Sequence, residues 1–92
     1  MLTFEDCVGL CELTEEEIAA IAEHEHLPQI VALELGSEMI RGRAGARVIR
    51  QIIVDDILAA KRRGNMIHAC QLEQTLCRFI AGHPDARQSF EQ

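Results

Sequence analysis

The chain has 92 residues, of which 48% are hydrophobic, and a formal net charge of −6. This length suits a single domain with a sizeable core, and three Phe without Trp or Tyr leave that core to aliphatic residues and Met. The composition disfavours a β-sandwich, and it leaves Arg as the platforms on which nucleic-acid bases could stack.

The charge is distributed unevenly along the chain. Residues 1–40 contain ten acidic residues and no Lys or Arg, whereas residues 41–63 contain seven basic residues and two acidic ones. We expect these two halves to neutralise each other partly when the chain folds. A basic face reserved for an external anion is the alternative.

The cellular location is predicted from what the N-terminus lacks. It has no basic leader, and no apolar run reaches the ~18–20 residues that span a membrane. We therefore expect a cytoplasmic protein without membrane contact. In the cytoplasm the four cysteines are expected to be free thiols, and none forms a C-x-x-C zinc motif. Their helical spacing predicts small hydrophobic residues packed in the core: Cys7, Cys11, Cys70 and Cys77.

Two helices are predicted in the first third of the chain. Thr3 can cap a short helix that runs to about Cys11. The segment Thr14-Glu-Glu-Glu17 is a capping box, which opens a second helix that extends from residue 15 to about residue 26. Pro28 ends it, because the proline ring pushes the preceding residue out of the helical region.

A third helix is predicted from residue 29 to about residue 40. It is apolar on nearly all sides, so we expect it to be covered from more than one direction. Gly36 lies in the middle of the pattern. We expect the helix to continue through it, with the glycine permitting close approach of another backbone.

The longest predicted helix, Ala46–Arg63, is the centre of the fold. Its apolar residues recur at i, i+3, i+4 and i+7 on one face, and Val54 and Leu58 extend the apolar surface, so neighbours are expected on at least two sides. Gly64 can adopt the left-handed cap, and Asn65 can open a last helix to about residue 81.

We therefore predict an all-α fold: a compact bundle of four main helices plus a short N-terminal helix. Residues 1–82 form the single helical domain. Residues 83–92 form a short C-terminal tail, for which a helical turn after the proline and disorder both remain open.

Histidines and glutamates suggest a metal- or redox-binding helical protein as one alternative function. His24 and His26 point to opposite sides of a helix, whereas Glu23 and His26 share a face. Di-iron bundles use such a Glu-x-x-His motif twice, but the stretch before His68 has Asn65 in place of the Glu. A homodimer could supply the second copy. The predicted ligands are Glu23 and His26, with Glu34 or Glu38 across the dimer.

Arginines suggest a second alternative, an anion site. Arg43, Arg47 and Arg50 fall on one side near the start of the central helix, where free N–H groups also favour anions. The phosphate-loop pattern is absent. Binding of nucleic acid is disfavoured, because the recognition helix of a helix-turn-helix would place Glu34 and Glu38 against phosphates.

Asp56 is an acidic residue on the buried stripe of the central helix. An unpaired carboxylate there would cost several kcal/mol, so we expect it to pair with Arg78 or Lys61 or to lie at a wet edge. A single acid without a base or a nucleophile defines no reaction, and we lean against an enzyme.

The apolar helix faces lead to the function that we favour from sequence. They exceed what one small bundle can cover, and a symmetric dimer is the commonest way to bury a remaining patch. We expect a non-enzymatic cytoplasmic protein without a cofactor that acts by protein–protein interaction. Its partner is itself, as a homodimer, or another protein, and Val54 and Leu58 are the predicted interface residues.

Overall fold

The computed structural model describes residues 3–9, 12–42 and 44–88. The chain is all-α, as predicted, and the described part contains no strand. The elements are the five helices α1 (Phe4–Gly9), α2 (Glu15–Glu25), α3 (Gln29–Arg41), α4 (Gly45–Arg62) and α5 (Met66–Gly82), followed by a short 3-10 helix, η1 (Pro84–Gln88). The predicted end of the first helix near Cys11 lies outside the described residues.

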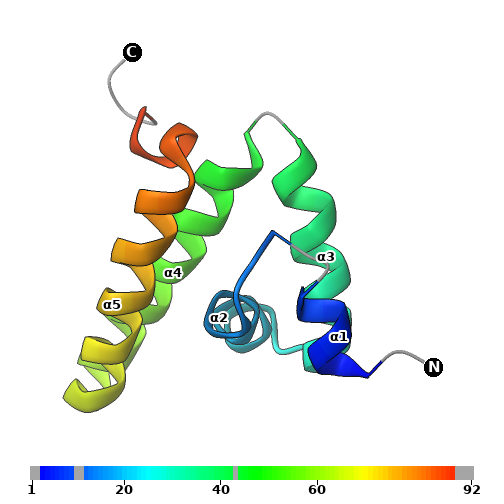
Figure 1. Ribbon diagram of the computed structural model, residues 1–92. Helices are drawn as coiled ribbons and strands as arrows, with labels where there is room; N and C mark the ends of the chain where they lie inside the picture. The colour runs from blue at the N-terminus through cyan, green and yellow to red at the C-terminus, as the bar shows by residue number, and fades with distance from the viewer. Residues whose placement is uncertain (1–2, 10–11, 43, 89–92) are drawn as a thin grey trace.

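The helices are arranged around α4. In Figure 1, α4 and α5 run side by side as an antiparallel hairpin, and α3 lies on the opposite side of the molecule. Helix α2, seen almost end-on, lies between the hairpin and α3 (Figure 1). Helix α4 contacts α2, α3, α5 and η1, so the prediction of a central helix with neighbours on at least two sides is confirmed.

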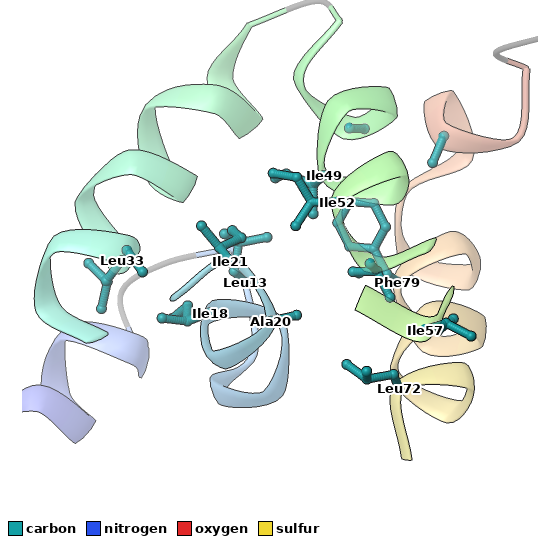
Figure 2. Close-up of a cluster of buried hydrophobic side chains, with 14 of the residues drawn as sticks. Leu13, Ile18, Ala20, Ile21, Leu33, Ile49, Ile52, Ile57, Leu72 and Phe79 are labelled. Atoms are coloured by element: carbon teal, nitrogen blue, oxygen red, sulfur yellow. The ribbon is translucent and has the colours of Figure 1, made fainter. Parts of the chain in front are cut away.

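The hydrophobic core is aliphatic apart from one ring. Figure 2 shows side chains of α2 between those of α3 and those of the α4–α5 hairpin. Phe79 of α5 is the largest side chain that is fully buried, and the next largest are all isoleucines: Ile18, Ile21, Ile49 and Ile53. The first half of the chain thus contributes α2 and α3 to the core, and the second half contributes the α4–α5 hairpin.

Local sequence signals set the helix boundaries. The capping box is complete: the Thr14 amide donates to Glu17 Oε1 at 2.8 Å, and the Glu17 amide donates to Thr14 Oγ1 at 3.2 Å. Helix α4 is followed by Gly64 in the left-handed region (φ 78°), and the Asn65 side chain accepts the His68 amide at the start of α5. All three signals were read correctly from the sequence.

Two glycines allow close helix packing. Helix α3 continues through Gly36, as predicted, and a Cβ there would lie 2.6 Å from Leu13 Cδ1 and 2.9 Å from Ile21 Cδ1. At the start of α4, a Cβ on Gly45 would lie 1.5 Å from the Met39 carbonyl oxygen. The α3–α4 junction therefore requires a residue without a side chain at position 45, which Gly45 supplies.

The predicted tail contains a short helical element. Of the two possibilities left open for the tail, residues 84–88 take the helical turn, η1. Ala86 is fully buried, and η1 contacts α4 and α5. In the described part of the chain, no helix is long and apolar enough to cross a membrane.

The prediction that Cys70 and Cys77 pack in the core is wrong, because both side chains are exposed. The buried stripe of α5 consists of Ala69, Leu72, Thr75 and Phe79. The two cysteines are seven residues apart and share a face, but that face points to solvent. The structure does not describe the side chains of Cys7 and Cys11.

Candidate functional site

An apolar groove opens where the end of α2 meets α3 and α4. Its volume is about 460 Å³, within the range of small-ligand and peptide pockets. The apolar walls are formed by Leu35 and Met39 of α3 and by Val48 and Ile52 of α4. The polar part of the lining comes from the end of α2 and the exposed face of α4: His24, Glu25, Gln51 and Asp55.

His24 links α2 to α4 at the rim of this groove. Its Nδ1 lies 2.8 Å from Glu25 Oε2 and its Nε2 lies 3.2 Å from Asp55 Oδ2. Burial lowers the pKa of His24, but the hydrogen bonds to Glu25 and Asp55 outweigh that effect and raise the pKa above 6.5. The hydrogen bond that Gln51 donates to Asp55 and the one from His24 lower the pKa of Asp55.

A second pair links α2 to the start of α5. His68 Nε2 lies 2.8 Å from Glu23 Oε1, and Arg63 Nη2 lies 3.7 Å from Glu23 Oε2. The carboxylate of Glu23 is therefore shared by a histidine and an arginine from the α4–α5 corner. Both pairs are partly exposed, so they position the helices more than they stabilise them.

Asp56 lies next to these two pairs and is buried, with 4% of its surface exposed. Its Oδ2 has no hydrogen-bond partner among the described residues. The predicted pairing with Arg78 or Lys61 is wrong: Arg78 is exposed, and Lys61 binds Glu73 at 3.2 Å. Lys61 follows Asp56 by five residues, which on a helix turns it well away.

The electrostatic surroundings of Asp56 oppose its ionisation. Burial makes the largest contribution, and the negative charge of Glu23 adds to it. Together these effects raise the pKa of Asp56 from 3.8 to about 7. The sequence pattern placed Asp56 on the buried face correctly, but it gave no indication of the acidic neighbours.

The lining of this groove offers apolar contact, hydrogen bonding and proton exchange. Among the described residues, no group of three His, Cys, Asp or Glu side chains has a geometry that could hold a metal ion. Apolar walls with an acidic rim suit a partner that brings apolar side chains and positive charge.

The predicted metal ligands have different surroundings in the structure. Glu23 faces His68, whereas His26 is the exposed left-handed cap of α2 (φ 58°), because the helix has ended before it. Glu34 and Glu38 are exposed on α3, and Glu38 pairs with Arg41. The metal site across a dimer stays a prediction from sequence, and no geometry in the described residues favours it.

The predicted anion-binding arginines are only partly described. Arg47 is exposed and Arg50 is half-buried, on one side of the first turns of α4. Arg43 lies outside the described residues. The start of α4 has no side-chain cap, but a helix N-terminus with one exposed arginine is too general a feature to define a ligand.

The predicted interface residues differ in exposure. Leu58 is 47% exposed, whereas Val54 is half-buried. Two apolar residues in the first turn of α5 are exposed, which the sequence did not predict: Met66 is 58% exposed and Ile67 is 76% exposed. The sequence feature that could have indicated their exposure is their position directly after the Asn65 cap, at the end of the hairpin. No local sequence pattern could have predicted the pairs Glu23–His68 and His24–Asp55.

The comparisons with known proteins assign no relative. No family model matches the chain, and no curated protein or solved structure matches it. The function is therefore argued from the geometry alone.

Proposed function

We propose that this protein is a non-enzymatic interaction module that forms a homodimer, in which the groove of each copy receives the α4–α5 corner of the other. The corner is defined as residues 61–67. A single observation carries the proposal: one chain presents both an apolar groove with an acidic rim and an exposed apolar corner with basic residues. Two surfaces that complement each other on one chain favour self-association.

The groove supplies the acidic partner. Glu25 and Asp55 lie at its rim, and the carboxyl end of α2 points its partial negative charge toward the same place. Of the apolar walls, Val48 is 46% exposed and Leu35 and Met39 are half-buried, whereas Ile52 is buried. An apolar side chain entering from a second copy would remove this surface from water.

The corner supplies the basic partner. Lys61, Arg62 and Arg63 are exposed at the end of α4, and Met66 and Ile67 are the two most exposed large hydrophobic residues described. Met is flexible enough to fit an irregular apolar surface. Exposure of Met66 and Ile67 in a free monomer would be unfavourable, whereas their insertion into the groove of a second copy combines burial with charge attraction.

The spacing along α4 allows the two contacts to form at once. An exposed stripe on α4 consists of residues three or four apart: Val48, Gln51, Asp55, Leu58 and Arg62. If two copies of α4 pair antiparallel with the twofold axis between Leu58 and Ala59, Asp55 of one copy lies level with Arg62 of the other. Arg62 at the corner then lies about 5 Å beyond the axis, as does Asp55 at the groove rim on the other side, at about 1.5 Å per residue.

The proposal is tested by changing the stripe and measuring mass in solution by light scattering after gel filtration. Leu58→Glu should give a folded monomer, because Leu58 is too exposed to belong to the core. Arg62→Glu should weaken the dimer at least about tenfold, because it would face Asp55. Arg78→Glu, the same change at an exposed position on α5, is the matched control and should leave the dimer intact. A Leu58→Glu protein that stays dimeric, or equal effects at positions 62 and 78, would contradict the proposal.

A further inference from the structure

A buried carboxyl group without a partner lies where three helices meet. Asp56 belongs to α4, and its Oδ2 is shielded from solvent without a hydrogen-bond partner in the described part of the chain. Ionisation of such a group would place a charge in a poorly solvated site. The proposed dimer makes no use of this residue, because it points into the chain and away from the exposed stripe.

Groups on all three helices surround Asp56. Helix α2 contributes Glu23 and His24, α4 contributes the adjacent Asp55, and α5 contributes His68. Both histidines already have carboxylate partners, since His24 binds Asp55 and His68 binds Glu23. Of the arginines, Arg63 lies beside Glu23, and the charge of Arg62 acts on Asp55. An ionised Asp56 would therefore be a third carboxylate among cations that are already paired.

We propose that Asp56 is a pH-sensitive latch between α2 and the α4–α5 hairpin, closed when the carboxyl group is protonated and loosened when its proton is released to solvent. The neutral carboxyl group is tolerated in the interface. The carboxylate is repelled by Glu23 and Asp55, and water must reach it, so α2 separates more readily from the hairpin. The latch acts within one chain, and it works in a monomer as well as in a dimer.

The direction of the pH dependence follows from proton linkage. The pKa of Asp56 is about 7 in the folded chain and 3.8 as the ordinary value, so the folded state holds the proton more tightly. The contribution of Asp56 to the free energy of unfolding is therefore lost as the pH rises from about 4 to about 7. His24 acts in the same direction, because its pKa is also raised in the folded state. The pKa of Asp55 is lowered in the folded state, so its contribution to stability changes only when the pH falls below its ordinary pKa of 3.8.

The first measurement is a carbon-13 NMR titration of the Asp56 carboxyl group in the unchanged protein. A midpoint near neutral pH is expected, and a midpoint near that of an ordinary aspartate would overturn the proposal. It needs no variant, so it decides the matter even if substitutions at this position prevent folding. Hydrogen exchange of the α2 amides, corrected for intrinsic rates, should show an opening constant that rises at least about tenfold from pH 5.5 to pH 8.

The second measurement compares two charge-removing variants. In Asp56→Asn the opening constant of α2 should change by less than about threefold over the same pH range, because only the contribution of His24 remains. Glu34→Gln removes the same charge from an exposed position on α3 and should keep the pH dependence of the unchanged protein. An Asp56→Asn protein that keeps the full pH dependence would overturn the latch.

Discussion

Replacement of Gly45 by alanine tests whether the α3–α4 junction is packed as tightly as the structure indicates. The new Cβ would lie 1.5 Å from the Met39 carbonyl oxygen and 2.3 Å from the Met39 carbonyl carbon. Ordinary contacts at such a position begin at 3.4 Å. Both atoms belong to the backbone, so no rotamer change can relieve the overlap. The last turn of α3 must move by about 2 Å from the start of α4.

The expected net cost is about 2 kcal/mol, since a backbone overlap of this size belongs at the upper end of overpacking, about 3 kcal/mol, and alanine recovers at most about 1 kcal/mol through helix propensity. For a domain of this size each kcal/mol lowers Tm by about 4–8 °C, so we expect a decrease of roughly 10 °C in thermal unfolding followed by circular dichroism.

Gly42→Ala is the matched control, because its Cβ would meet the same Met39 oxygen at an ordinary 3.5 Å. Gly82→Ala is a second control, since it would meet no atom within 4 Å. Equal stability of Gly45→Ala and Gly42→Ala would refute the argument and mean that α3 and α4 can separate without loss. The groove would then lack a fixed shape.

Three further predictions concern the core, a helix cap and the thiols. Phe79→Ala should lose about 3–5 kcal/mol in urea denaturation, because the ring is fully buried, and a loss below about 1 kcal/mol would contradict its place in the core. Thr14→Ala should cost about 1 kcal/mol by the same assay, because it breaks one bond of the capping box with Glu17, and Thr14→Ser should keep most of the stability. Cys70 and Cys77 should react with a maleimide in the folded protein at the rate of exposed thiols, as followed by mass spectrometry, and slow labelling would contradict their exposure.

The fold could be predicted from the sequence because its signals are local. The capping box at Thr14, the left-handed Gly64 and the Asn65 cap each depend on residues within four positions of one another. The 3.6-residue period of α4 likewise identified the central helix. These features depend only on hydrogen bonds and packing along one helix, which a sequence pattern shows directly.

The site could be predicted only in part, because its contacts are long-range. His24 meets Asp55 across 31 positions of the chain and His68 meets Glu23 across 45, and no periodicity records such pairs. The same limit explains the error at Cys70, since a seven-residue spacing shows that two residues share a helix face but not which neighbour that face meets. Asp56 was placed correctly on the buried face, but the predicted pairing with Arg78 or Lys61 was wrong.

Sedimentation equilibrium of the unchanged protein at micromolar concentration, under reducing conditions, tests the proposed homodimer most directly. One chain has a mass of 10.3 kDa, and the groove-and-corner pairing predicts a species of twice that mass which dissociates on dilution. Reducing conditions exclude a dimer joined by a disulfide between exposed cysteines. A mass of 10.3 kDa at all concentrations would contradict the proposal that a second copy of the chain fills the groove.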